Sequence, residues 1–390
     1  MVSFDNTEIA FSSKSNIDLN RSYWLFTLIS RSYLVKVGGF ITQMALYLHL
    51  PIAFLVKATI FKQFCGGENI KDCDKTIDSL AKFHIGTILD YSVEGKSSDS
   101  DFDDTVNEIM RTIDRAKQNK AIPFSVFKVT GIAPFEILEK VSAQKVLSQN
   151  ETISFEKVQQ RVHLLCQRAS ESGVPILIDA EESWIQPAID DLANEMMKLF
   201  NKEKAIVFNT YQMYRKDRLG YLKNSLFEAR EQKYWVGAKV VRGAYMEKER
   251  KRAEFMGYPS PIQDSKDETD KAYNDAIEFC VENIDSIALC AGTHNEMSSW
   301  KLNNMMKVAN IDLTDKRIYF SQLLGMSDHI SYNLSNEGFN VAKYMPYGPL
   351  REVLPYLMRR AEENTSVKGQ TGRELSLIIS EKRRRQQKAA

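Results

Sequence analysis

The chain has 390 residues, with 52 Lys and Arg against 51 Asp and Glu, so its formal net charge is only +1. A balanced charge gives no global electrostatic reason to expect nucleic acid as a partner. With 43% hydrophobic and 26% charged residues, the composition is that of a globular protein with a large core. The five cysteines are odd in number and lack C-x-x-C spacing, which favours a reducing compartment and argues against structural zinc.

Residues 1–80 are predicted to form a helical N-terminal arm, because they lack the alternating apolar pattern of strands. Acidic residues near the start and the lack of a continuous apolar segment argue against a signal or transit peptide. Residues 40–61 are the most hydrophobic stretch. Four residues interrupt it: Gln43, His49, Pro51 and Lys57. Because a spanning helix needs about 20 nearly uninterrupted apolar residues, we expect two packed helices there.

Eight short apolar runs follow the arm and alternate with longer amphipathic segments. They cover residues 84–91, 123–131, 174–181, 204–212, 236–245, 286–295, 317–325 and 339–348. Nearly continuous β-branched and aromatic runs are typical of parallel strands buried on both faces. Eight βα units predict an α/β fold, a (β/α)8 barrel over residues 81–366, followed by a basic C-terminal tail over 367–390.

Reactive or hydrogen-bonding side chains gather where the predicted strands end. These residues are Lys128, Asp179 with Glu181, Gln212, Lys239 with Arg242 and Tyr245, Thr293-His294-Asn295, Gln322 and Tyr344. In a barrel enzyme the active site is built at the C-terminal ends of the strands. Each residue alone has an ordinary structural explanation, but their shared position indicates an enzyme.

The last run leads into the sequence YMPYGPLREVLPYLMRRAEEN at residues 344–364. Pro349 is favoured in the first turn of a helix. One face of that helix, at spacing i, i+3, i+4 and i+7, carries Tyr356, Arg359, Arg360 and Glu363. Adjacent guanidiniums can form a carboxylate-binding fork. A surface helix with an ordinary ion pair explains the same spacing.

The motifs of several enzyme classes are missing. No Ser or Cys nucleophile motif accompanies His294, and neither a G-x-G-x-x-G nor a P-loop sequence is present. No HExxH or similar metal-binding spacing occurs. The remaining cations and amides suit a polar, anionic cofactor such as a flavin. The residues alone do not separate a flavin from a phosphorylated substrate.

Six stretches together resemble the proline dehydrogenase family, in particular its monofunctional form. They are ILIDAEES, VFNTYQMYRKD, KVVRGAYMEKER, GTHN, FSQLLGMSD and YMPYGPLREVLPYLMRRAEEN, within residues 80–366. The resemblance implies a distorted, TIM-like (β/α)8 barrel behind a helical arm, with non-covalently bound FAD. It also implies oxidation of L-proline to Δ1-pyrroline-5-carboxylate by hydride transfer to the flavin, with electrons passed to a membrane quinone.

The resemblance further implies roles for individual residues. Arg359 and Arg360 would hold the proline carboxylate, with help from Lys128, and Tyr344, Tyr356 and Leu324 would contact the ring. Asp179 matches an acidic residue that orients the arginine pair, and Tyr245 matches a tyrosine of the site. The positions expected to bind FAD are Gln212, Lys239, Arg242, Thr293, His294, Asn295, Gln322 and Glu363.

Two positions need comment within this resemblance. Bifunctional bacterial relatives have Arg where Lys239 stands, and a lysine can still donate toward the flavin N5 but without bidentate geometry. Glu94, after the first predicted strand, matches an acidic gate residue, although a plain turn glutamate fits equally well.

Three other functions stay open at this stage. Hydroxyproline dehydrogenase is a sister activity whose members tend to carry a smaller residue in place of the ring-wall tyrosine, whereas Tyr344 is kept here. Methylenetetrahydrofolate reductase is another flavin barrel, and a non-catalytic binding barrel belongs to a different class. We expect a cytoplasmic protein with peripheral contact at the inner face of a membrane, on the matrix side if mitochondrial.

Overall fold

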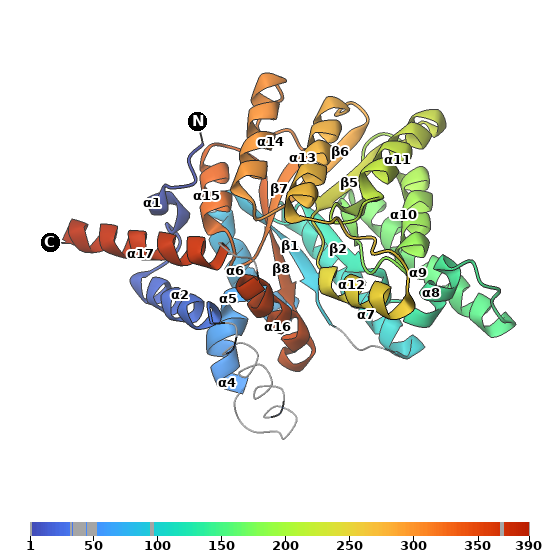
Figure 1. The fold of residues 1–390 in the computed structure, drawn as a ribbon, viewed down its shortest axis with the longest axis horizontal. Coiled ribbons are helices and arrows are strands. Elements are labelled where there is room, and N and C mark those ends of the chain that lie inside the picture. Colours follow the sequence, from blue (N-terminus) through green and yellow to red (C-terminus); the bar gives the residue numbers. More distant parts are fainter. Residues whose placement is uncertain are drawn as a thin grey trace. The chain divides into compact units, whose positions relative to one another are not determined.

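A computed structural model of the chain describes residues 2–31, 33, 44, 53–93, 97–366 and 370–389, with the side chains of 362–371 and 389 left out. The predicted helix pair over 40–61 lies partly outside this range, and Glu94 lies outside it entirely. Eight strands form a closed barrel in chain order. The predicted α/β barrel is therefore confirmed (Figure 1).

Each strand lies inside one of the predicted apolar runs. The strands are β1 (Ile85–Tyr91), β2 (Phe124–Lys128), β3 (Ile176–Asp179), β4 (Val207–Gln212), β5 (Val236–Val241), β6 (Ile287–Gly292), β7 (Ile318–Leu323) and β8 (Val341–Tyr347). Every residue of β3, β4 and β8 is buried. Burial on both faces explains why these runs are continuously apolar instead of alternating.

Contacts divide the chain into two compact units, which are described separately. The central unit, Lys96–Ser321, contains β2 to β6 and most of β7. Its helices lie outside its strands (Figure 1). They are α7 (Asp99–Gln118), the 3-10 turn Val129–Gly131, α8 (Phe135–Ser142), α9 (Gln149–Ser172), α10 (Gln186–Phe200), α11 (Arg218–Gln232), α12 (Met246–Met256), α13 (Lys266–Glu282) and α14 (Glu296–Val308).

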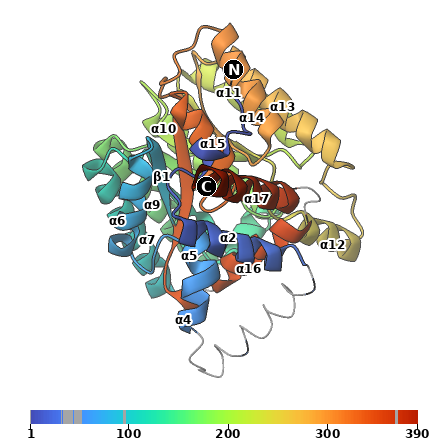
Figure 2. The same cartoon turned by 90° about the vertical axis from the view of Figure 1, so that its left-hand side faces the viewer.

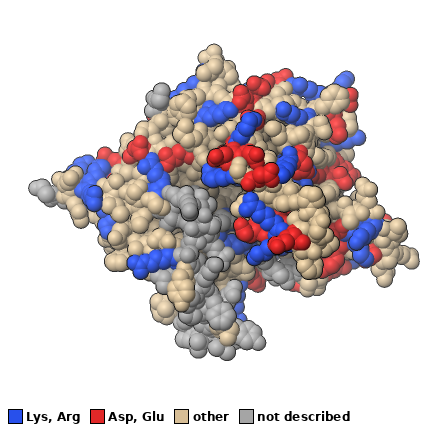
Figure 3. Space-filling model, viewed as in Figure 1, with Lys and Arg blue, Asp and Glu red and all other residues tan. Residues whose placement is uncertain are grey.

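Local sequence signals begin several of these helices. In α7, α9 and α13 a serine N-cap and an acidic residue three positions later form capping boxes, which satisfy otherwise unpaired N–H groups. Lys, Arg, Asp and Glu intermingle on the surface over α12 and α13 (Figure 3). This mixture agrees with the balanced net charge.

The second unit joins the two ends of the chain, Met1–Gly95 and Gln322–Ala390. It contains β1, β8 and helical segments from both stretches. They are α1 (Thr7–Ala10), α2 (Asn16–Ile29), α4 (Ala53–Val56), the π-helical Lys57–Phe61, α5 (Lys62–Phe64), α6 (Ile70–Ala81), α15 (Asp328–Asn336), α16 (Leu350–Ser366) and α17 (Gln370–Ala389). Phe26, Phe64 and Leu357 belong to one hydrophobic cluster in this unit.

Most of the predicted basic tail forms a packed helix, α17, which lies beside α2 (Figure 2). Arg385 on α17 donates to the carbonyl oxygens of Phe11 and Lys14, each at 2.9 Å. The C-terminal helix therefore holds the N-terminal segment through its basic side chains. Within the described ranges, no helix combines the length and the apolar character that crossing a bilayer requires.

Candidate active site

Asp179, the last residue of β3, lies between two lysines of the central unit. Its Oδ1 is 2.6 Å from Nζ of Lys239 on β5, and its Oδ2 is 3.3 Å from Nζ of Lys128 on β2. Lys128 and Asp179 are also register partners across the β2–β3 ladder. Two ammonium groups share one carboxylate, so this group of strand-end side chains carries excess positive charge. Such a group suits an anionic ligand.

Two residues after Asp179, Glu181 is a buried carboxyl, whose position in the sequence marks it only as a polar residue at a strand end. It accepts hydrogen bonds from the Thr130 backbone N–H at 3.0 Å and from the Thr130 hydroxyl. Gln212 donates to the Glu181 carbonyl oxygen at 2.7 Å. Burial raises the pKa of Glu181 to about 7, even though both Thr130 bonds act to lower it.

Arg242 uses all three of its guanidinium nitrogens on protein groups. They donate to Asp270 at 2.6 Å, to the Thr293 hydroxyl at 2.6 Å and to the Ser298 hydroxyl at 2.8 Å. The guanidinium also stacks 4.3 Å from the centre of the Tyr273 ring. These contacts fix the Arg242 side chain beside the turn between β6 and α14.

That turn contains three of the predicted cofactor residues, Thr293, His294 and Asn295. Asn295 is the N-cap of α14: its side chain accepts from the Ser298 N–H at 3.0 Å, and its own N–H donates to the Thr293 hydroxyl at 3.0 Å. N–H groups at the start of a helix favour anionic ligands. The donor chemistry of this turn, together with the lysines near Asp179, fits a phosphate-bearing flavin cofactor.

Tyr245 is half-buried and is the N-cap residue of α12. The helix that follows is fixed to the loop after β3. Glu249 accepts from the Ser183 N–H and hydroxyl, both at 2.6 Å, and the Arg252 guanidinium lies 4.3 Å from the Trp184 ring centre. These contacts hold the segment that begins at Tyr245.

In the second unit, α16 carries the predicted arginine pair. Arg360 and Tyr356 are only 7% and 6% exposed, and the Arg360 guanidinium lies 5.1 Å from the Tyr356 ring centre. Arg359 is half-buried. The burial of Arg360 excludes the plain solvent-facing helix as an explanation of this face. Glu363 belongs to α16, but its side chain lies outside the described residues.

The remaining predicted contacts of this unit lie on β7, β8 and the turn after β7. Tyr344 and Leu324 are buried, and the Leu324 N–H donates to the Tyr344 carbonyl oxygen at 2.9 Å. Gln322, also buried, accepts from the Ser331 hydroxyl at 2.8 Å. The backbone therefore couples the two residues that were predicted to contact the substrate ring.

The second unit, like the central one, contains a carboxylate shared by two lysines, which sequence reasoning missed. Asp328, at the start of α15, lies 2.9 Å from Nζ of Lys14 and 2.9 Å from Nζ of Lys343. Lys343 precedes Tyr344 in β8 and is fully buried. A lysine within an apolar strand was the only signal in the sequence, and it does not identify a partner.

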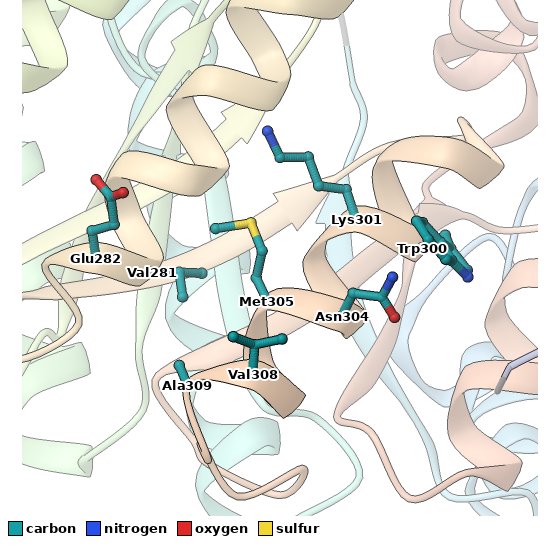
Figure 4. Close-up of a pocket in the computed structure, with 8 residues that line it drawn as sticks. All are labelled: Val281, Glu282, Trp300, Lys301, Asn304, Met305, Val308 and Ala309. Atoms are coloured by element: carbon teal, nitrogen blue, oxygen red, sulfur yellow. The ribbon is translucent and has the colours of Figure 1, made fainter.

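A groove on the central unit contains none of these residues. It lies between α13 and α14 and is lined mainly by apolar side chains (Figure 4). The apolar lining comes from Val281, Trp300, Met305, Val308 and Ala309. In the part of the chain that the structure describes, no cluster of three or more His, Cys, Asp and Glu could hold a metal ion.

The family whose sequence profile matches the chain is described as proline dehydrogenase, and the match covers residues 73–373. The chain belongs to this family. The resemblance drawn from the six motifs is thereby confirmed.

Individual relatives agree with this assignment. A mitochondrial proline dehydrogenase 1 of Dictyostelium discoideum is 34% identical over 379 residues, covering 86% of this chain and 66% of that protein. The carbapenem antibiotics biosynthesis protein CarD of Pectobacterium carotovorum is 34% identical over 322 residues and 83% of each chain. A crystal structure of proline utilization A from Bdellovibrio bacteriovorus shares the fold, with a TM-score of 0.73 at 20% identity, over 92% of this chain and 38% of that one.

Proposed function

We propose that this chain oxidises L-proline to Δ1-pyrroline-5-carboxylate, the first step of proline catabolism, with FAD as cofactor and a membrane quinone as electron acceptor. Membership of the proline dehydrogenase family supports the proposal. The structural observation that carries it is the buried Arg360, stacked on Tyr356 in the helix with the most specific family motif. A buried guanidinium suits a small carboxylate substrate, because its paired planar donors match the two oxygens.

The substrate residues divide into charged and apolar groups. Arg359 and Arg360 bind the proline carboxylate, and Lys128 adds positive charge. Tyr344, Tyr356 and Leu324 enclose the apolar ring and exclude water from it. Because no residue has to act as a nucleophile, the protein contributes mainly by orienting the substrate, whose amine must be neutral to react.

The bound flavin supplies the hydride acceptor. The protein supplies residues that hold the cofactor and further residues that orient them. The residues proposed to hold it are Gln212, Lys239, Thr293, His294, Asn295, Gln322 and Glu363. Asp179 fixes the direction of the Lys239 ammonium through their 2.6 Å contact. Arg242 belongs to the same proposed set, and it also holds Thr293 and Ser298.

The membrane quinone implies that the protein works at a bilayer surface. Electrons have to reach an acceptor dissolved in the lipid, so we place the protein peripherally on the inner face of a membrane. The relative from Dictyostelium discoideum is named as mitochondrial. If this chain comes from a eukaryote, the corresponding place is the matrix side.

A visible spectrum of the purified protein, taken before and after anaerobic L-proline, tests the activity. We expect a flavin absorption band at about 450 nm that is bleached by proline. Bleaching by trans-4-hydroxy-L-proline should be weaker, because the bulky Tyr344 is kept. A colourless protein, or one whose flavin proline leaves unchanged, would refute the proposal. Faster bleaching by hydroxyproline would assign the sister activity instead.

Arg360→Met tests the carboxylate contact. Loss of a buried charge-paired contact typically costs about 2–5 kcal/mol, so kcat/KM for proline should fall by that equivalent while FAD stays bound. Arg351→Met is the matched control, because Arg351 is an exposed arginine of the same helix. Near-normal proline kinetics in Arg360→Met would remove Arg360 from the substrate site.

A further inference from the structure

Lys343 is a buried charge that no step of the proposed reaction uses. Its exposed fraction is 0%. The ammonium lies 2.9 Å from Asp328 Oδ1, donates to the Met326 carbonyl oxygen at 2.6 Å, and reaches the Leu323 carbonyl oxygen at 3.5 Å. An ammonium has three N–H donors, and all three acceptors belong to one segment, residues 323–328. A buried charge is costly unless it is paired in this way.

Asp328 balances the charge of this segment. Its second oxygen lies 2.9 Å from Nζ of Lys14. Burial on its own would raise the pKa of Asp328, but the two ammonium groups of Lys14 and Lys343 hold it well below its usual value. Lys14 and Lys343 thus pair with the same carboxylate at the same distance, but the Lys14 side chain is 17% exposed and that of Lys343 only 1%. Lys343 additionally bonds two backbone carbonyl oxygens of the turn, those of Leu323 and Met326.

The bonded segment is the turn from β7 to α15, which contains Leu324. Gly325 in this turn has φ +75°, and the Gln63 side chain donates to its carbonyl oxygen at 2.8 Å. A Cβ atom at Gly325 would lie 2.0 Å from the Gln63 carbonyl oxygen, so a side chain does not fit there. The Ser327 N–H donates to Glu374 of α17. Lys343, Gln63 and Glu374 therefore hold the turn at successive backbone groups.

We infer that Lys343 is a positioning residue, which fixes the carbonyl groups of Leu323 and Met326 and thereby holds Leu324 against the substrate ring. The inference rests on the proposed function, from which the role of Leu324 comes. Successive side chains of a strand point to opposite faces. Tyr344 thus presents one wall of the ring site, while its neighbour Lys343 sets the turn that carries another wall.

Two matched substitutions separate this function from a purely structural one. Lys343→Met and Lys14→Met each remove one ammonium from Asp328 and leave the other. Only Lys343→Met also releases the backbone of the turn. A structural role in charge balance predicts a loss of stability in both variants without a separate change at the turn, whereas a positioning role predicts consequences at the turn for Lys343→Met alone.

Amide hydrogen exchange of the FAD-loaded protein measures the turn directly. We expect faster exchange in peptides covering residues 323–328 for Lys343→Met than for Lys14→Met and wild type, because local opening controls exchange. Equal exchange in the two variants would overturn the inference. This readout does not depend on turnover. It therefore tests whether Lys343 holds the turn even if the wild type failed to oxidise proline.

Steady-state kinetics measure the consequence for the substrate. We expect Lys343→Met to raise the KM for L-proline about tenfold and to change kcat less. The reason is that a displaced Leu324 weakens the contacts that position the substrate ring. Lys14→Met should keep the KM of the wild type. An unchanged KM in Lys343→Met, or an equal rise in Lys14→Met, would refute the positioning role, whereas a wild type without proline turnover would refute the proposed function itself.

Discussion

Each of the two units contains an aspartate shared by two lysines, but the two arrangements differ in what else the lysines touch. In the central unit Asp179 contacts Lys239 and Lys128, and the Lys128 side chain is 27% exposed. In the second unit Asp328 contacts Lys14 and Lys343, and the Lys343 ammonium also donates hydrogen bonds to backbone carbonyl oxygens. A partly exposed lysine can turn toward a ligand. A buried lysine with protein partners on every donor can only brace the fold.

Two buried carboxyls, Asp328 in the second unit and Glu181 in the central unit, have pKa values shifted in opposite directions. Lys14 and Lys343 compensate the burial of Asp328 and hold its pKa low. Glu181 accepts its hydrogen bonds from the neutral Thr130, and burial raises its pKa to about 7. The pairing of a buried carboxylate with cations, and not burial alone, decides whether it stays charged at neutral pH.

The largest expected effect is on stability, in Asp328→Asn. Removing the carboxylate leaves two ammonium groups close together, and breaking a buried ion pair typically costs about 3–5 kcal/mol. We expect the free energy of unfolding, measured by urea denaturation, to fall by that amount. Turnover per folded molecule should change little, because the carbonyl bonds of Lys343 remain.

A matched control is Asp275→Asn, which breaks an exposed i,i+4 pair with Lys271 on α13. Such pairs contribute about 0.3–0.5 kcal/mol. If Asp328→Asn cost no more than this control, the Lys14–Asp328–Lys343 group would not be a stabilising unit, and the contrast between the two units would fail.

Asp179→Asn should show the opposite division between stability and turnover. Without the carboxylate, Lys239 and Lys128 lose the group that orients them toward the ligands of the proposed site. We expect kcat/KM for proline to fall about a hundredfold, equivalent to about 2.7 kcal/mol and within the range for a buried charge contact. The loss of unfolding free energy should be smaller than in Asp328→Asn. A variant that unfolds easily but turns over normally when folded would show that Asp179 is structural.

The barrel was predictable because its signals are local. Each strand lies within an apolar run of the sequence, and parallel strands covered on both sides produce such runs directly. The helical character of residues 370–389 was not predicted. Their basic side chains suggest a solvated tail, yet Arg385 bonds backbone carbonyls near the other end of the chain. That partner lies hundreds of positions away, so no local pattern indicates it.

The candidate site was predictable where a residue is recognised by its motif or by its place at a strand end. Asp179 and Lys128 end their strands and Lys239 lies two residues before the end of β5, and the structure brings these three together. Asp328 and Lys343 were missed because their pairing depends on how α15 packs beside β8. The hydrogen bonds of Arg242 to Asp270, Thr293 and Ser298 join separate segments of the chain, so sequence spacing does not show them either.

The last expected effect concerns Glu181 and, unlike the others, vanishes at low pH. The pKa of Glu181 is about 7 in the folded protein against an ordinary value of 4.5. Between these values the folded state binds more protons than the unfolded state, so stability falls as the pH rises through this window. Glu181→Gln removes that loss. We expect the variant to match the wild type near pH 4.5 and to exceed its unfolding free energy by about 3 kcal/mol at pH 8.

Thr130→Val is the matched variant for this pH dependence, because the Thr130 hydroxyl donates to the Glu181 carboxylate and acts to lower its pKa. Without that donor the charged form is less favoured, so the pKa should rise further and the loss of stability toward pH 8 should be steeper than in the wild type. Glu181→Gln and Thr130→Val therefore move the slope of unfolding free energy against pH in opposite directions. Slopes that coincide in all three proteins would show that Glu181 does not titrate in this range, and that its burial is compensated as fully as that of Asp328.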